Sequence, residues 1–211
     1  MGKEKSLDIS VMMACLNEAK TVGLCVEKAV QALKQLGLQG EVLVVDNGST
    51  DGSVEIAKGK GARVVSEAQR GYGYACRKGF REARGRFLVM GDADGTYDFS
   101  LIGPLIEPLK NGTDLVIGSR LKGHMLPGAM PWFKLEFGNR ISTRMINFLF
   151  RMRLTDSQSG LRAFRRDALQ DLPLKAPGME FATEMIIGTS RKGMRIAEVP
   201  IVQGHVPDLR C

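Results

Sequence analysis

Residues 89–100 read VMGDADGTYDFS, and this stretch decides the fold prediction. Three carboxylates, Asp92, Asp94 and Asp98, follow closely after the apolar run 87–90. A short apolar run bounded by polar residues is typical of a buried strand. In open α/β sheets, ligands bind beyond the carboxyl ends of the strands. The stretch therefore predicts a buried strand that ends at a ligand site.

Apolar runs and stretches of helical periodicity alternate around this strand. The runs predict strands at 7–14, 41–45, 63–65, 86–90 and 114–117, and the periodic stretches predict helices at 21–36, 49–60, 74–83 and 101–110. Alternation of this kind favours the α/β class, with a mostly parallel, doubly wound sheet and helices on both faces.

The second half of the chain is less regular. It predicts a loop at 118–131, a long helix at 132–150, an extended segment at 161–164, a helix at 180–192 and a closing strand at 195–199. The sequence contains no internal repeat, low-complexity tract or linker. We therefore expect a single domain over 1–211, with its core at about 7–201 and a short tail at 202–211.

Composition narrows the class of partner. The 211 residues carry a formal net charge of +7, which favours an anionic partner such as a phosphorylated ligand or an acidic membrane surface. A nucleic-acid binder is not favoured, because the charge is spread and basic and aromatic residues do not interleave. The four cysteines form no CxxC pair, and the N-terminus has no apolar signal segment. No apolar run reaches the ~18 residues of a membrane span, so we expect a cytoplasmic protein.

Polar clusters follow several predicted strands, and a parallel sheet brings such ends to one edge. These clusters are Asn17-Glu18, Asp46-Asn47-Gly48, Asp92-Ala93-Asp94 and Gly118-Ser119-Arg120. In an extended segment, Asp92 and Asp94 point to the same side, where a cation would relieve their repulsion. Oxygen ligands without His or Cys favour Mg²⁺ or Mn²⁺. The alternative is that both carboxylates cap the next turn.

The ordered set of motifs resembles the inverting family 2 glycosyltransferases with a GT-A fold. The nearest branch is the polyprenyl-phosphate sugar transferases of the dolichyl-phosphate mannose synthase and glucosyltransferase type. The resemblance extends from about Ile9 to Ile201 and rests on VMMACLNEAKTVGLCVEKAV, EVLVVDNGSTDGS, RGYGYACRKGF, GRFLVMGDADGTYDF, DLVIGSR, DSQSGLRAFRRDAL and GMEFATEMI with RIAEVPI. The family often reads DADLQHPP where this chain reads DADGTYDF.

The resemblance implies a set of donor-binding residues. Asn17 and Glu18 lie where the family holds the nucleoside. Asp46 matches the carboxylate that reads the base, with uracil and guanine both open; alternatively, it caps its turn. The glycines of RGYGYA, Gly71 and Gly73, would let the backbone approach the nucleotide with Arg70 beside it, or they form only a turn before a helix.

The resemblance also implies the metal ligands. Asp92 matches the first Asp of the family's DxD motif, near the ribose and the metal. Asp94 matches the metal ligand itself and is therefore a catalytic candidate. Asp98 lies where relatives often complete or support the metal shell.

Three further residues are candidates for chemistry at the acceptor. Arg120 ends a strand at the predicted site, and Arg162 lies in SGLRAFRR, which the family uses around the acceptor phosphate. Arginine offers forked donors suited to phosphate, although both residues could be solvated surface. Glu184 is a candidate base or a site-facing charge; the alternative is a helix-face carboxylate paired with a basic neighbour.

The function implied is transfer of a sugar, glucose or mannose first, from a UDP- or GDP-linked donor to polyprenyl phosphate. The enzyme would then be peripheral at the inner face of the membrane, and the predicted helix 132–150 is either interfacial or a plain core helix. Where relatives continue with a basic segment, this chain ends VQGHVPDLRC, which predicts a short soluble form or a truncated chain. The alternatives are a carbohydrate hydroxyl as acceptor and a nucleotide-sugar-binding domain without turnover. The oligomeric state stays open.

Overall fold

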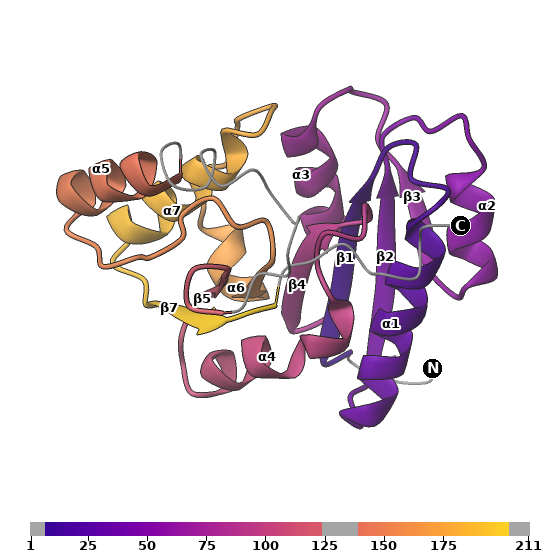
Figure 1. The fold of residues 1–211 in the computed structure, drawn as a ribbon, viewed down its shortest axis with the longest axis horizontal. Coiled ribbons are helices and arrows are strands. Elements are labelled where there is room, and N and C mark those ends of the chain that lie inside the picture. The colour runs from indigo at the N-terminus through magenta and orange to yellow at the C-terminus, as the bar shows by residue number, and fades with distance from the viewer. Residues whose placement is uncertain (1–6, 124–138, 203–211) are drawn as a thin grey trace, which may run out of the picture.

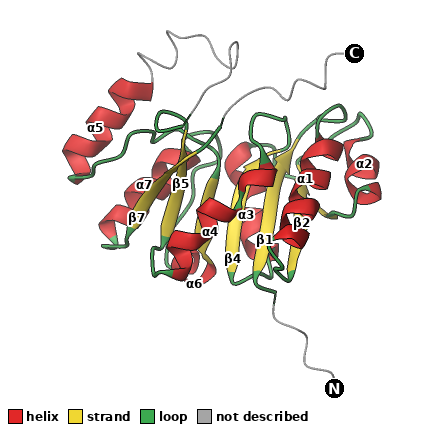
Figure 2. Cartoon of the chain, turned by 60° about the horizontal axis from the view of Figure 1, so that its bottom comes forward, coloured by secondary structure: helices red, strands yellow, loops and turns green. Residues whose placement is uncertain are grey.

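The computed structural model describes residues 7–123 and 139–202, and Figures 1 and 2 show their arrangement. The strands in these ranges belong to one sheet, formed by β1 (Ile9–Cys15), β2 (Gly40–Asp46), β3 (Arg63–Ser66), β4 (Phe87–Asp92), β5 (Leu115–Ser119), β6 (Arg162–Arg165) and β7 (Ile196–Pro200). Their order in the sheet is β3-β2-β1-β4-β6-β5-β7. Only β6 runs antiparallel to its neighbours, so the prediction of a mostly parallel sheet is confirmed.

Helices cover both faces of this sheet (Figure 2). They are α1 (Val22–Gln35), α2 (Ser53–Gly59), α3 (Tyr72–Glu82), α4 (Gly103–Lys110), α5 (Arg140–Phe150), α6 (Arg166–Gln170) and α7 (Phe181–Arg191), with a 3₁₀ turn η1 at Phe99–Leu101. Successive side chains of β1 point to opposite faces of the sheet, and this alternation explains why the helices form two layers. Val11 and Met13 enter a core shared with α1 and α4, whereas Met12 enters a second core shared with α3 and α7.

The central strands are apolar along nearly their whole length because both of their faces are buried. In β1, positions 9–13 are all fully buried, and Met12 is paired with Leu43 of β2 and Met90 of β4. Parallel pairing in this register brings Cys15, Asp46 and Asp92 to one edge of the sheet. That edge holds the candidate site.

The differences from the predicted elements are local, apart from one. β4 extends to Asp92, two residues beyond the predicted end, so the first carboxylate belongs to the strand. The predicted helix 101–110 is divided into η1 and α4, with Pro104 in the first turn of α4, where its missing N–H costs nothing. Within the described residues, the predicted helix 132–150 is represented by α5, and positions 132–138 lie outside them. The larger difference is that β6 inserts antiparallel between β4 and β5.

Candidate active site

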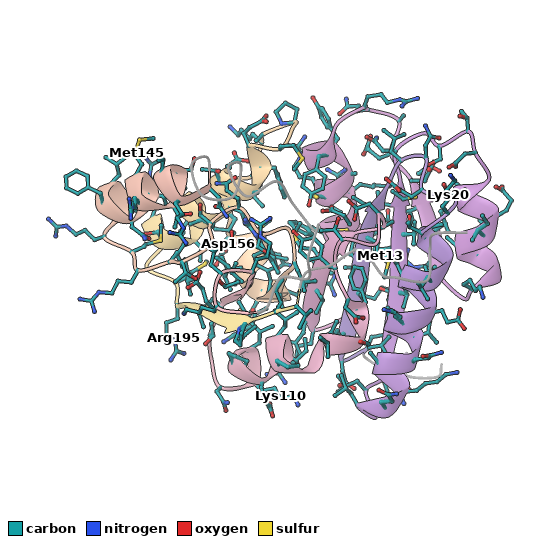
Figure 3. All side chains as sticks on the ribbon, in the orientation of Figure 1. Met13, Lys20, Lys110, Met145, Asp156 and Arg195 are labelled. Carbon is teal, nitrogen blue, oxygen red and sulfur yellow. The ribbon has the colours of Figure 1, made fainter. Side chains whose placement is uncertain are left out.

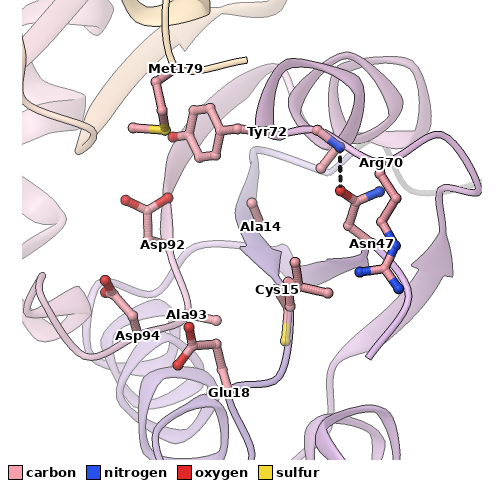
Figure 4. Close-up of a pocket in the computed structure, with 13 residues that line it drawn as sticks. Ala14, Cys15, Glu18, Asn47, Arg70, Tyr72, Asp92, Ala93, Asp94 and Met179 are labelled. Atoms are coloured by element: carbon pink, nitrogen blue, oxygen red, sulfur yellow. Dashed lines mark hydrogen bonds between the residues drawn. The ribbon is translucent and has the colours of Figure 1, made fainter. Parts of the chain in front are cut away.

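A cavity of about 360 Å³ lies beyond the carboxyl ends of β1, β2 and β4 (Figure 4). It is lined by residues from five separate segments: Ala14, Cys15, Leu16, Glu18, Asn47, Arg70, Gly71, Tyr72, Ala75, Asp92, Ala93, Asp94 and Met179. Five of the residues predicted from the sequence are among them, namely Glu18, Arg70, Gly71, Asp92 and Asp94. The cavity thus lies where the strand ends predicted it.

Three carboxylates form one wall of this cavity: Asp92, Asp94 and Glu18 (Figure 4). Asp92 is held by the end of β4, where the backbone N–H of Ala93 donates to Ala14 O at 3.1 Å. Asp94 Oδ1 accepts from the N–H of Thr96 at 2.9 Å. The other carboxylate oxygen of Asp94, Oδ2, does not take part in this bond. The wall is therefore acidic and rigidly placed.

Burial gives this wall an unusual electrostatic state. Burial raises the pKa of Asp92 to about 7, and the neighbouring charge of Asp94 adds to the increase, while a hydrogen bond from the Tyr72 side chain opposes it. Burial likewise raises the pKa of Glu18, and the charges of Asp94 and Asp51 contribute. A divalent cation would favour the charged forms and lower these pKa values. The donor set of carboxylate oxygens fits Mg²⁺ or Mn²⁺.

The third predicted ligand, Asp98, does not belong to this wall. Its carboxylate caps η1 by accepting from the N–H and the hydroxyl of Ser100 at 3.0 and 2.8 Å, and it pairs with Lys28 at 3.2 Å. Within the described ranges, no group of three His, Cys, Asp or Glu side chains is placed to hold a metal ion. A metal here would need oxygens from a ligand to complete its shell.

At the end of β2, Asn47 rather than Asp46 faces the cavity. Asp46 accepts from the N–H groups of Gly48 and Ser49 at 3.2 and 3.0 Å, which is the turn-capping alternative. Asn47 Oδ1 accepts from Gly71 N at 2.8 Å, the dashed line in Figure 4. Its amide donates to the carbonyls of Glu67 and Gln69 at 3.0 and 2.8 Å. Asn47 therefore joins the end of β2 to the start of α3.

Asn17 and Gly73 are also placed outside the cavity lining. Asn17 Oδ1 accepts from Thr50 N at 2.8 Å and joins the loops after β1 and β2. Gly73 lies against the segment before α7, where a Cβ would come within 2.0 Å of Ala176 O. Another group does approach the backbone closely at Gly73, as predicted, but that group is the carbonyl of Ala176 and not a nucleotide. Gly71, with φ +142°, both lines the cavity and approaches Pro177.

Arg120 and Arg162 do not take the predicted phosphate roles. The buried Arg120 pairs with Asp156, with Nε–Oδ2 at 2.6 Å and Nη2–Oδ1 at 2.8 Å. Figure 3 labels Asp156, which has no exposed surface. Arg162 is also fully buried, and it donates to the carbonyls of Ser157, Ser159 and Ala182 at 2.9, 2.8 and 2.6 Å. Both guanidinium groups therefore have their hydrogen-bonding partners inside the protein.

Asp156 has a stable negative charge in this arrangement. Burial alone would raise its pKa, but the hydrogen bonds from Arg120 and Asn139 hold that pKa below its ordinary value. Asn139 Nδ2 donates to Asp156 Oδ1 at 2.7 Å. This pair could not be predicted from the sequence, since Arg120 and Asp156 are 36 positions apart and nothing local indicates their contact.

Glu184 does not face the acidic cavity. Its carboxylate accepts from the backbone N–H groups of Lys175 and Ala176, and it lines a different, largely apolar cavity beside Phe150 and Ile187. Glu184 therefore lies outside the acidic cavity, and its role as a base stays a prediction. Tyr72 and Met179 were missed as lining residues; only the position of Tyr72 inside RGYGYA could have indicated it.

A doubly wound α/β sheet with an acidic, metal-compatible cavity beyond its central strands is an arrangement suited to nucleotide-sugar binding. Comparison with known proteins makes the class specific. The model of the glycosyl transferase family 2 matches residues 10–173, and the chain belongs to this family.

Named relatives cover most of the chain. It is 41% identical over 194 residues to the low-salt glycan biosynthesis hexosyltransferase Agl6 of Haloferax volcanii, covering 92% of this chain and 47% of Agl6. A dolichyl-phosphate hexose transferase of the same organism is 30% identical, over 92% of this chain and 82% of that protein. The chain thus spans about half of the length of Agl6.

Among solved structures, it is similar to glucosyl-3-phosphoglycerate synthase of Mycobacterium tuberculosis in complex with Mn²⁺, UDP and phosphoglyceric acid. The TM-score is 0.70 at 26% identity, over 94% of this chain and 70% of the other. These likenesses agree with the GT-A fold that the motifs predict.

Proposed function

We propose that the protein transfers a hexose, with inversion, from a nucleotide-sugar donor to a polyprenyl phosphate at a membrane surface. The observation that carries this proposal is the carboxylate pair Asp92 and Asp94 in a cavity at the end of β4. Support comes from relatives named as a hexosyltransferase and a dolichyl-phosphate hexose transferase, and from a structural neighbour that binds UDP and Mn²⁺.

Asp94 and Asp92 are the residues that would hold Mg²⁺ or Mn²⁺, with Glu18 beside them. When bound, the metal neutralises the diphosphate that leaves with the nucleotide. Without a cation, the acidic wall would repel an anionic donor, and Asp92 takes up a proton instead, as its raised pKa indicates. The carboxylates therefore make donor binding dependent on the cation.

The rest of the cavity suits the nucleotide. Asn47 and Gly71 form one boundary through their hydrogen bond of 2.8 Å. Arg70 adds an exposed guanidinium next to them, held by a single long bond of 3.3 Å to Gly48 O, so donors remain for a phosphate. The side chain of Tyr72 lies at the same end of the cavity as Asp92 and opposes the rise of that carboxyl's pKa (Figure 4). These residues position the donor opposite the acidic wall.

A phosphate acceptor agrees with the position of Glu184. A hydroxyl acceptor must lose a proton to a base, whereas a phosphate is already anionic at neutral pH and needs mainly to be positioned. Glu184 is engaged elsewhere, so it supplies no base to the cavity. The anionic acceptor is therefore favoured over a carbohydrate hydroxyl.

The exposed face of α5 supports a membrane surface as the place of reaction. Ile141, Met145, Phe148 and Leu149 are 57%, 60%, 85% and 61% exposed. At about 100° per residue they form one stripe, roughly opposite the buried Thr143 and Ile146. Figure 3 shows Met145 on the outer side of the helix.

Basic residues lie beside this apolar stripe on the same helix. Arg140 and Arg144 lie about 40° apart on the helical wheel, along one border of the stripe, and Arg151 follows the helix as its C-cap. An apolar face with a basic border suits insertion into an anionic leaflet, with each charge adding about 1 kcal/mol. The interfacial alternative for this helix is therefore favoured over the plain core helix. No helix in the described ranges has the length and apolarity to cross a bilayer.

A transfer assay tests the proposal. Purified protein is incubated with Mg²⁺ or Mn²⁺, detergent-dispersed polyprenyl phosphate and, in turn, labelled UDP-glucose, UDP-galactose, UDP-N-acetylglucosamine or GDP-mannose. We expect label in the organic phase with one donor, abolished in Asp94→Asn. The matched control is Asp98→Asn, because Asp98 lies outside the cavity and asparagine still caps η1. Label in a water-soluble product with phosphoglycerate as the acceptor, together with none in the organic phase when polyprenyl phosphate is the acceptor, would reject the polyprenyl acceptor.

A further inference from the structure

The segment at 174–178, here called the strap, joins α6 to α7 and is held by α7 on one side. The Glu184 carboxylate accepts from Lys175 N through both oxygens at 2.9 and 3.0 Å, and from Ala176 N at 2.9 Å. Charged acceptors of backbone N–H groups make the stronger class of hydrogen bond. Glu184 thus satisfies two consecutive backbone donors of an irregular segment.

On its other side, the strap closes the N-terminus of α3. Gly73 N donates to Pro177 O at 2.8 Å, and Arg77 Nη1 donates to Ala176 O at 2.9 Å. The first N–H groups of a helix have no partner inside the helix, and α3 has no side-chain cap, so the strap supplies the missing acceptor. The two segments touch so closely that only glycine fits at position 73.

The strap also reaches the donor cavity. Met179, the next residue after it, lines the cavity together with Gly71 and Tyr72 of the opposing segment. Figure 4 shows Met179 and Tyr72 at the same end of the cavity, next to Asp92. A displacement of the strap would therefore move this wall.

We propose that Glu184 is a positioning residue that holds the strap against α3 and so fixes the wall formed by Gly71, Tyr72 and Met179. The effect on the donor rests on the proposed function, whereas the effect on the strap does not. Glu184 touches no group of the acidic wall; its influence passes through the backbone of residues 175–177. Removing it leaves two N–H groups without their acceptor and so loosens the contact of the strap with α3.

The first test needs no ligand. Hydrogen exchange of Glu184→Ala is followed for the amides of residues 175 and 176 and of 71–76. We expect faster exchange in both groups and unchanged exchange in β1. Glu107→Ala is the control, because Glu107 is an exposed helical glutamate of α4 whose partner is the exposed Lys110 at 3.6 Å. Glu184→Gln keeps one acceptor oxygen and is expected to be intermediate; it also serves if the alanine variant does not fold.

The second test uses UDP with Mg²⁺ in titration calorimetry, then the donor kinetics. We expect Glu184→Ala to raise the Kd for UDP and the KM for the donor about tenfold, a change equal to ~1.4 kcal/mol, with kcat within a few-fold of wild type. A catalytic base would give the opposite split, with kcat reduced and KM retained.

Each outcome decides the inference. Unchanged exchange at 175 and 176 overturns the hold on the strap. Faster exchange there with unchanged exchange at 71–76 and unchanged UDP affinity overturns the link to the cavity. If the wild type binds no nucleotide, the proposed function fails, but the exchange measurements still confirm or overturn the positioning role.

Discussion

Replacing Gly73 by alanine is expected to destabilise the protein, although glycine to alanine usually stabilises a helix. Gly73 lies in the first turn of α3. A Cβ at this position would lie 2.0 Å from Ala176 O and 3.0 Å from the carbonyl carbons of Ala176 and Pro177. All three atoms are backbone, so no side-chain rotation can make room. Either the strap or the start of α3 must move.

The size of the movement and its cost follow from these distances. Ordinary contact begins at 3.4 Å, so the oxygen must retreat by 3.4 − 2.0 = 1.4 Å. A shift of that size breaks the bond of 2.8 Å from Gly73 N to Pro177 O. Overpacking costs ~1–3 kcal/mol and the lost hydrogen bond about 1, while alanine returns about 0.5–1 kcal/mol of helix propensity. The net loss is roughly 2 kcal/mol, or ~4–8 °C in the unfolding midpoint of a chain of this size.

Thermal and urea unfolding followed by circular dichroism measure this loss, with Gly59→Ala as the matched control. Gly59 also lies in a helix, α2, but nothing lies within 4 Å of its added Cβ. We expect Gly59→Ala to unfold at or slightly above the wild-type midpoint. A Gly73→Ala variant that is as stable as Gly59→Ala would show that the strap yields freely, and the account of the cavity wall would fail with it.

Three other perturbations have signs that the structure determines. In the metal-free protein, burial and the charge of Asp94 raise the pKa of Asp92 from its ordinary value of 3.8 to about 7. The native state then binds the extra proton, so this group's contribution to the free energy of unfolding is complete below about pH 4 and falls as the pH rises to about 7, by up to roughly 4 kcal/mol. Urea titrations across this pH range should show that fall in the wild type and its absence in Asp92→Asn; parallel curves would contradict it. Asp156→Ala leaves the buried Arg120 without its partner and should cost about 3–5 kcal/mol, whereas a loss below 1 kcal/mol in urea unfolding would mean that water reaches the site. Phe148→Ser should weaken sedimentation with anionic vesicles while leaving the unfolding midpoint unchanged, because the side chain is 85% exposed; equal binding of both proteins would exclude α5 as the membrane face.

The sequence predicts the sheet well where strands are local and apolar. The run 87–90 is almost entirely buried, and Asp92 and Asp94, which follow it, line the cavity. Such runs can be recognised from the local sequence alone, since each is bounded by polar residues and its burial can be predicted without knowing its distant partner. The same holds for β1 and β2, whose ends the alternation places at one edge.

The position of β6 could not be read in this way. Its four residues, Arg162–Arg165, contain two arginines, and nothing local says that they insert between β4 and β5. Pairing partners are set by the whole fold, and this pairing moves Arg120 away from the β4 carboxylates. Arg120 is instead paired with Asp156, whereas Arg162 donates to backbone carbonyls. A forked donor in a buried position binds the acceptors that the fold brings to it.

Three of the aspartates share a local pattern that the sequence contains. Asp51, Asp94 and Asp98 are each followed two positions later by Ser or Thr, and each accepts from that residue's backbone N–H. Short polar side chains commonly satisfy themselves in such turns. Asp92 is instead followed two positions later by another aspartate, and the side chain of Tyr72, earlier in the chain, opposes the rise of its pKa.

A carboxylate that accepts hydrogen bonds from neighbouring backbone N–H groups acts mainly as a cap. It contributes to a binding site only where the fold also places it beside the cavity. Asp94 is placed in this way because its turn lies at the cavity, whereas Asp98 is turned toward Lys28. Asp92 lacks the local partners and meets another negative charge instead, which is why its pKa rises. Binding of a cation beside a carboxylate in this state therefore stabilises the folded protein. We therefore expect Mg²⁺ or Mn²⁺ to raise the free energy of unfolding of the wild type more at pH 8 than at pH 5. In Asp92→Asn, the increase at both pH values should be as small as that of the wild type at pH 5. An equal increase for both proteins at both pH values would mean that the cation binds elsewhere.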